Sequence, residues 1–138
     1  QAEVREGLRA GDAVLLDAPC SATGTLRRHP DIAWLQPAAA RAGLTQAQDR
    51  LLSNAVDMVK PGGLLVYAVC SLQSQEGPER IAALLAGDSR VERLPLSPDE
   101  LTGLEDVITP EGDLRSLPCH LSGRGGLDGF YACRLKRH

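Results

Sequence analysis

Two short apolar segments, each followed closely by Ser, constrain the fold of this chain more than any other feature. The first covers residues 13–20 and closes on Cys20, and the second covers residues 64–70 and closes on Cys70. The sequence between them has a helical pattern and ends in Lys60-Pro61-Gly62-Gly63, so strand, helix and strand follow one another as in a βαβ unit. We therefore expect an α/β fold in which two neighbouring parallel strands bring their carboxyl ends to one ligand-binding edge of the sheet.

Composition limits the class of protein. The 138 residues suit one domain with one core, and that core must be mainly aliphatic because 43% of residues are hydrophobic but only 3% aromatic. The formal net charge of −3 gives no overall basic field, so contact with nucleic acid would have to be local. Four cysteines without a Cys-x-x-Cys pair argue against a metal site. No membrane-spanning run or signal peptide is seen, which predicts a cytoplasmic protein with reduced thiols.

The hydrophobic spacing predicts the order of the elements. Residues 1–12 are expected to form a loop; strands are predicted over 13–17, 64–70, 91–96 and 129–136, and helices over 45–60 and 78–86. We expect Thr45 to cap the longer helix and Pro61-Gly62-Gly63 to end it. For residues 97–116 the sequence predicts no regular structure beyond one helical turn over 98–104. The last strand is expected to pair with residues 117–121 and to bury Phe130.

Residues 18–37 form a long connection that contains several Pro and Gly residues, and connections of this length inside a compact domain are usually functional. It carries Arg27, Arg28 and His29 in succession. These side chains are candidates for binding RNA phosphates, and a solvated loop is an equally good interpretation.

The two cysteines are candidate nucleophiles. A thiolate attacks carbon and can later leave, and backbone N–H groups in a strand-end turn can lower the pKa of a thiol. The alternative is that both are small buried residues, which is common for free cysteine. Two matching Cys-Ser ends favour function. Because neighbouring strands are about 4.8 Å apart, we expect the side chains of Cys20 and Cys70 to come within roughly 10 Å of each other.

Three segments together resemble a known family: DAPCSATGTLRRHPDIAWL over 17–35, LLSNAVDMVKPGGLLVYAVCS over 51–71 and DGFYACRLKR over 128–137. They are similar to the NOL1/NOP2/Sun family of S-adenosylmethionine-dependent RNA cytosine-5 methyltransferases, in the family's motif order from about residue 13 onward. The resemblance implies a Rossmann-like class I methyltransferase fold, with a mostly parallel sheet and an antiparallel C-terminal strand.

The resemblance also implies roles for single residues. Cys70 matches the family's nucleophile, which adds to C6 of cytosine, and Cys20 matches the cysteine that helps to release the methylated product. Asp17 matches the strand-end acid that holds the cytosine edge around N3 and N4, and Asp17 and Pro19 would also lie toward the cofactor. Glu76 matches the start of an acidic pattern after the nucleophile, for which we expect a structural role.

The sequence departs from the family's pattern in several places. Ala22 stands where Gly is usual, and Ala68-Val69 and Gly77-Pro78 replace the common residues around the nucleophile. No Gly-rich cofactor turn and no acidic ribose-binding residue precede residue 13. We therefore expect residues 1–138 to form the C-terminal part of one catalytic domain without its cofactor-binding half. Such a chain should be inactive alone and prone to self-association through an exposed sheet edge.

These observations predict an RNA cytosine-5 methyltransferase that acts on ribosomal RNA and flips its target base between Asp17, Cys20 and Cys70. A tRNA methyltransferase with the same chemistry is the alternative within the class. A non-catalytic RNA-binding remnant is the alternative outside it, and the missing cofactor half favours it. A thiol oxidoreductase is the least favoured, because a Cys-x-x-Cys motif is lacking.

Overall fold

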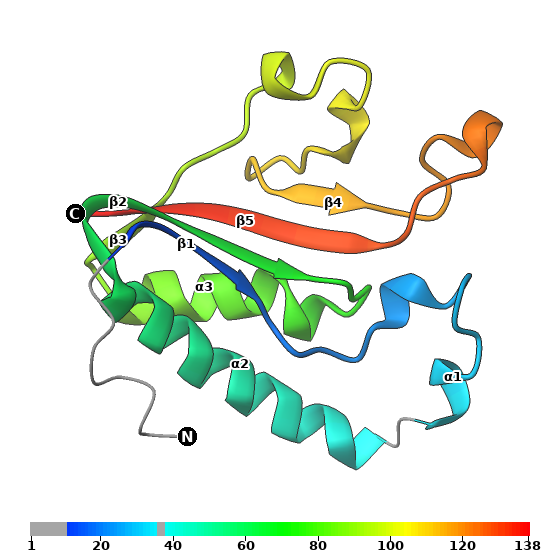
Figure 1. Ribbon diagram of the computed structural model, residues 1–138, viewed down its shortest axis with the longest axis horizontal. Coiled ribbons are helices and arrows are strands. Elements are labelled where there is room, and N and C mark those ends of the chain that lie inside the picture. The colour runs from blue at the N-terminus through cyan, green and yellow to red at the C-terminus, as the bar shows by residue number, and fades with distance from the viewer. Residues whose placement is uncertain (1–10, 36–37) are drawn as a thin grey trace.

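The computed structural model describes residues 11–35 and 38–138 (Figure 1). The strands are β1 (Gly11–Asp17), β2 (Val59–Val69), β3 (Val91–Arg93), β4 (Leu114–Ser116) and β5 (Phe130–Arg137). The α-helices are α1 (Ile32–Leu35), α2 (Ala38–Met58) and α3 (Pro78–Gly87). Single turns of 3₁₀-helix are η2 (Thr23–Thr25), η3 (Ser74–Glu76), η4 (Pro98–Leu101), η5 (Glu105–Val107) and η6 (Ser122–Arg124).

The described strands form one sheet in the order β1-β2-β5-β3, with β4 also paired to β5. β1 and β2 are parallel and place Asp17 opposite Ala68. β5 is antiparallel to β2, β3 and β4, so β5 alone runs against the common direction of the other four. The predicted α/β fold, with strands mostly in one direction and a reversed C-terminal strand, is therefore confirmed.

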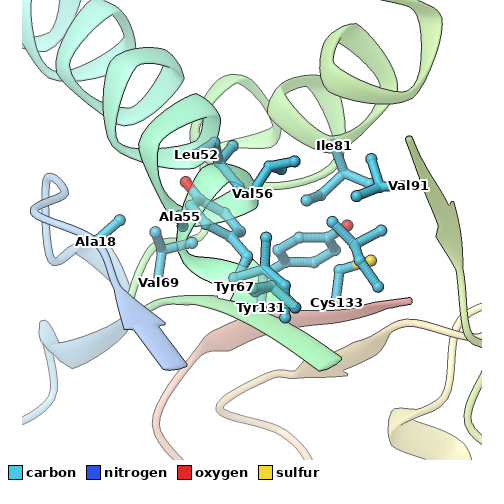
Figure 2. Close-up of a cluster of buried hydrophobic side chains, with 13 residues drawn as sticks. Ala18, Leu52, Ala55, Val56, Tyr67, Val69, Ile81, Val91, Tyr131 and Cys133 are labelled. Carbon is cyan, nitrogen blue, oxygen red and sulfur yellow. The ribbon is translucent and has the colours of Figure 1, made fainter. Parts of the chain in front are cut away.

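Helices α2 and α3 cover the same face of the sheet (Figure 1), and the core lies between them and the strands (Figure 2). Fully buried side chains come from both layers, including Leu52, Val56, Leu65, Ile81 and Leu135. A fully buried leucine of this kind stabilises the fold by about 2 kcal/mol. Two buried tyrosines complete the core, and each hydroxyl has a partner: Tyr67 donates to the Glu76 carbonyl at 2.6 Å and Tyr131 to the Asp113 carboxylate at 2.6 Å.

The predicted limits of the longer helix were wrong at both ends. Thr45 lies inside α2 and does not cap it, because the helix already includes the run of alanines that begins at Ala38, and alanine is the best helix former. The helix ends at Met58, before Pro61-Gly62-Gly63. Buried Val59 pairs with Gly11 as the first residue of β2, and the register then jumps to Leu64 opposite Ala13. Pro61-Gly62-Gly63 thus forms an irregularity inside β2.

The strands beyond residue 90 also differ from the predictions. β3 ends at Arg93 rather than at residue 96, since Pro95 has no N–H to give to a ladder. The neighbour of β5 is β4 at Leu114–Ser116, and not residues 117–121. That later segment contains Pro118 and reaches Leu121 with a left-handed φ of 52°, which is incompatible with an extended strand.

Phe130 does not belong to the core: it is 37% exposed, whereas the next residue, Tyr131, is fully buried. Side chains alternate along a strand, so a shift of one residue exchanges the two faces.

Of the loop expected over residues 1–12, residues 1–10 lie outside the described residues and the other two belong to β1. The helical turn expected after residue 97 is present as η4.

β1 forms one side of the sheet. Among the described residues it pairs only with β2, so its other edge has no strand partner. Leu15 in this strand is 71% exposed. The exposed edge strand is therefore as predicted for the part of the chain that the structure describes. No helix in that part is long and apolar enough to cross a membrane.

Candidate active site

The two cysteines meet at the carboxyl ends of β1 and β2. Cys70 directly follows β2, and Cys20 lies three residues beyond the end of β1. Their Sγ atoms are 3.5 Å apart, which confirms the predicted proximity. Two backbone hydrogen bonds carry the pairing of the strands into the loops: Ala18 N–H donates to the Ala68 carbonyl at 2.9 Å and Gly24 N–H to the Cys70 carbonyl at 3.0 Å.

The loop after β1 is packed so closely that one position requires glycine. A Cβ atom on Gly24 would lie 1.8 Å from the carbonyl oxygen of Gly129. Gly129 N–H in turn donates to the Gly24 carbonyl at 2.8 Å. This contact holds the Cys20 loop against the start of β5, which pairs with β2. Three segments that are far apart in sequence therefore fix the surroundings of the two thiols.

The surroundings of Cys20 favour the neutral form of its thiol. Burial raises the pKa of the Cys20 thiol to about 12, and its hydrogen bond with Cys70 acts in the same direction. At neutral pH Cys20 therefore remains a protonated thiol beside the sulfur of Cys70. A protonated thiol can donate a hydrogen bond, so Cys20 is a candidate donor to the Cys70 sulfur beside it.

The serines that directly follow the two cysteines belong to a cluster of buried polar side chains, made of Ser21, Gln48, Ser71 and Glu76. Gln48 donates to the Pro19 carbonyl at 2.9 Å, and both serines donate to the Glu76 carboxylate. Sequence reasoning expected a structural role for Glu76 and did not predict a role for Gln48 or the serines. The available signal was a glutamine four residues before Leu52, on the buried face of an otherwise apolar helix stripe.

Asp17 and Pro19 both have exposed side chains at the same edge of the sheet. Asp17 is the last residue of β1. It pairs with Ala68 of β2, which lies two residues before Cys70. No described residue makes a hydrogen bond or ion pair with its carboxylate, which leaves both oxygens available to a ligand. The structure therefore brings Asp17 to the same strand ends as the two thiols.

The Arg27-Arg28-His29 segment is exposed but not unattached. Arg27 donates to the carbonyls of Gly125 at 2.5 Å and Leu127 at 3.4 Å. Arg28 forms an ion pair with Asp128 at 2.5 Å. These contacts bind the loop after β1 to the Gly-rich segment before β5. The guanidinium groups retain further N–H donors, so they can still contact phosphate, but part of their hydrogen bonding already serves the fold.

A cavity of about 270 Å³ lies between α2 and α3, where Asp49 and Arg80 form an ion pair, and neither cysteine lines it. Asp17 and Pro19 could contact a molecule at the strand ends, but they do not by themselves form a cradle for S-adenosylmethionine. Within the described residues no cluster of side chains could hold a metal ion either.

The sheet, its reversed last strand and the site at the strand ends define a Rossmann-like methyltransferase fold. The crystal structure of the protein PH0851 is similar, with a TM-score of 0.80 and 30% identity, over 97% of this chain and 28% of that one. A methyltransferase homologue from Pyrococcus horikoshii superimposes with a TM-score of 0.69 and 28% identity, over 94% of this chain and 40% of that one.

The sequence matches the family of 16S rRNA methyltransferase RsmB/F over residues 2–136, and the chain belongs to this family. It is 39% identical to ribosomal RNA small subunit methyltransferase B of Shewanella oneidensis, over 90% of this chain and 26% of the relative. The protein of the same name from Vibrio vulnificus is 42% identical, over 87% of this chain and 25% of the relative. The chain thus spans about a quarter of the length of these relatives.

Proposed function

We propose that this chain supplies the cytosine-binding and nucleophilic part of an S-adenosylmethionine-dependent RNA (cytosine-5) methyltransferase that acts on ribosomal RNA. The observation that carries the proposal is the 3.5 Å separation of the Cys20 and Cys70 sulfurs at the carboxyl ends of two neighbouring parallel strands. Membership of the RsmB/F family and the rRNA methyltransferase names of the relatives support it.

The first step falls to Cys70. Its thiolate adds to C6 of a cytosine flipped out of the RNA, and the electrons of the C5–C6 double bond make C5 a nucleophilic carbon. Asp17, exposed and without a partner among the described residues, would hold the N3 and N4 edge of the ring and favour the protonated form that accepts this addition. S-adenosylmethionine, when bound, supplies the methyl group that C5 takes up.

The second step reverses the addition. Transfer of the C5 proton to a solvent water molecule restores the double bond, and the electrons of the broken S–C6 bond leave with Cys70 as a thiolate. The protonated Cys20 thiol, 3.5 Å from that sulfur, can donate a hydrogen bond to the departing thiolate and so stabilise it. This division of roles uses both cysteines and explains why the thiols would lie within contact distance.

The partners follow from the same site. We propose that Arg27, Arg28 and His29 contact RNA phosphates beside the cysteines, and that Asp17 and Pro19 face a cofactor held mainly by residues outside the described part of the chain. A cytoplasmic location, where thiols stay reduced, agrees with four cysteines that form no disulfide among the described residues.

The test uses the full-length gene product that contains this chain, with 16S rRNA and isotopically labelled S-adenosylmethionine. We expect label at C5 of cytosine, complete loss of labelling for Cys70→Ala, and unchanged labelling for Cys119→Ala, since Cys119 is an exposed cysteine elsewhere on the molecule. Labelling that survives Cys70→Ala would disprove the assignment of Cys70 as the nucleophile. Labelling of tRNA instead of rRNA would favour the alternative substrate, and RNA binding without any methylation would favour a non-catalytic protein.

A further inference from the structure

Glu76 is a buried carboxylate that the proposed mechanism does not use. Its residue is 1% exposed, although it lies in the turn η3 between the nucleophile and helix α3. Burying an acidic side chain without partners is expensive, so a glutamate in this position requires donors. All the donors it has come from the segments that carry the two cysteines and from helix α2.

The donors surround both carboxylate oxygens. Oε1 accepts the backbone N–H of Ser21 at 2.9 Å and the Gln48 side-chain amide at 3.5 Å. Oε2 accepts the Ser21 hydroxyl at 2.6 Å and also the Ser71 hydroxyl. Ser21 follows Cys20 and Ser71 follows Cys70, so one carboxylate connects the residues directly after the two thiols.

Cys20 depends on this carboxylate more than Cys70 does. Cys70 directly follows β2, which is hydrogen-bonded to β1 on one side and to β5 on the other. Cys20 lies in a loop whose backbone, among the described residues, is tied to the sheet through Ala18 before it and Gly24 after it. Between those two points the Ala22 carbonyl accepts hydrogen bonds from Thr25 of the same loop, and the backbone bonds to other segments are those of Ser21 with Glu76 and of Pro19 with Gln48.

We propose that Glu76 is a positioning residue that holds the Cys20 thiol against the sulfur of Cys70. The proposal rests on the proposed function in one respect: if Cys20 acts in product release, Glu76 governs release more than it governs addition. A carboxylate suits this place because it only accepts hydrogen bonds and can take several donors at once. An amide would present N–H groups to one of these donors.

The proximity of the thiols can be measured on the 138-residue chain without RNA or cofactor. In a Cys119→Ser background, diamide removes two electrons and two protons from Cys20 and Cys70 and leaves an intramolecular disulfide. We expect Glu76→Gln to slow this reaction about tenfold, the effect of losing one hydrogen bond to a charged group. The matched control is Glu79→Gln, which changes an exposed carboxylate three residues later in α3, whose one partner among the described residues is the Ser74 hydroxyl. Equal rates for the two variants would overturn the proposal.

The Glu76→Gln variant is isosteric with the wild-type protein and keeps the hydrogen bond from the Tyr67 hydroxyl to the backbone carbonyl of residue 76, so we expect it to fold. Circular dichroism checks this. If Glu76→Gln does not fold, Ser21→Ala removes a single donor to the same carboxylate, and exposed Ser53→Ala is its control. Slower disulfide formation in Ser21→Ala alone supports the proposal, and equal rates contradict it.

A second readout separates positioning from a purely structural role. In the full-length gene product, Glu76→Gln should accumulate the covalent complex with 16S rRNA, whereas a loss of folded protein would lower the amounts of adduct and of product together. If disulfide formation slows but the wild-type protein methylates no RNA, the positioning stands and the proposed function fails. If the wild-type protein methylates RNA but the disulfide rate is unchanged, the positioning fails.

Discussion

The sulfur atoms of Cys20 and Cys70 lie 3.5 Å apart although fifty positions separate them in the sequence. The parallel pairing of β1 with β2 brings the two segments to the same edge of the sheet, and the close contact between Gly24 and Gly129 holds the Cys20 loop down. A ligand that reaches one of these sulfurs therefore also lies beside the other.

The Cys20 thiol should react slowly with iodoacetamide at neutral pH. Only the thiolate is nucleophilic, and burial raises the pKa of Cys20 to about 12 from the ordinary 9.0. The rate should keep rising with pH through pH 10, whereas that of glutathione levels off. Mass spectrometry of the Cys20 peptide measures it. Modification at pH 7 as fast as that of glutathione would contradict the assignment.

The same shift predicts a loss of stability in alkali. A group whose pKa is raised in the folded state stabilises the fold below its unfolded pKa, and that contribution disappears as the pH rises through the folded pKa. Burial also raises the pKa of Cys133 to about 12, so the stabilising contribution of both thiols is expected to disappear between pH 9 and 12. The melting temperature should fall across this window, and a constant value would show that neither thiol is shifted.

Replacing Cys20 should separate the two halves of the reaction. In the full-length gene product, Cys20→Ala keeps the Cys70 nucleophile but removes the hydrogen-bond donor beside the departing sulfur. We therefore expect covalent complexes with 16S rRNA to form and accumulate, visible as a shifted band under denaturing conditions, while Cys70→Ala forms none. Adducts with Cys70→Ala but not with Cys20→Ala would exchange the two roles.

The basic loop predicts a salt effect. If Arg27 and Arg28 each contact one phosphate, replacing both by Ala should reduce the slope of log K against log salt by about 0.7 per contact on single-stranded RNA. Filter binding of the full-length gene product to 16S rRNA fragments measures the slope. The control is Arg90→Ala, since Arg90 is engaged with Asp57 and Asp88. An unchanged slope in the double variant would limit both arginines to their contacts with residues 125–128.

Much of the fold was predictable because its signals are local. Apolar runs followed by Cys-Ser predicted the ends of β1 and β2, and the meeting of Cys20 with Cys70 followed from the rule that parallel strands present their carboxyl ends together. The errors arose where tertiary contacts outweigh local preference. Val59 reads as the end of a helix, but burial and pairing with Gly11 place it in a strand.

The buried polar cluster was harder to predict for a different physical reason. Serine, glutamine and glutamate are common on surfaces, and nothing local distinguishes Glu76 from exposed Glu79 three residues later. Only the fold shows that one of them lies under two cysteine loops and receives their donors. Partner-dependent burial of this kind depends on residues more than 50 positions apart, which periodicity does not register.

Cofactor binding should be undetectable for the 138-residue chain by itself. Asp17 and Pro19 are exposed at the strand ends, and neither lines the cavity between α2 and α3. Isothermal titration with S-adenosylmethionine should show no binding at micromolar concentrations, while the full-length gene product serves as the positive control. Micromolar affinity of the 138-residue chain would show that residues 1–138 already contain the cofactor site.

The same chain should self-associate through β1. Among the described residues this strand has one unpaired edge, and Leu15 on it is 71% exposed. An unpaired apolar edge is a template for pairing with another chain, and a charged side chain there discourages it. Leu15→Lys should therefore lower the apparent mass in light scattering toward that of a monomer. Leu94→Lys changes a less exposed leucine away from β1, at 37%, and should leave the mass unchanged. A wild-type chain that is already a monodisperse monomer would contradict the prediction, as would equal effects of the two substitutions.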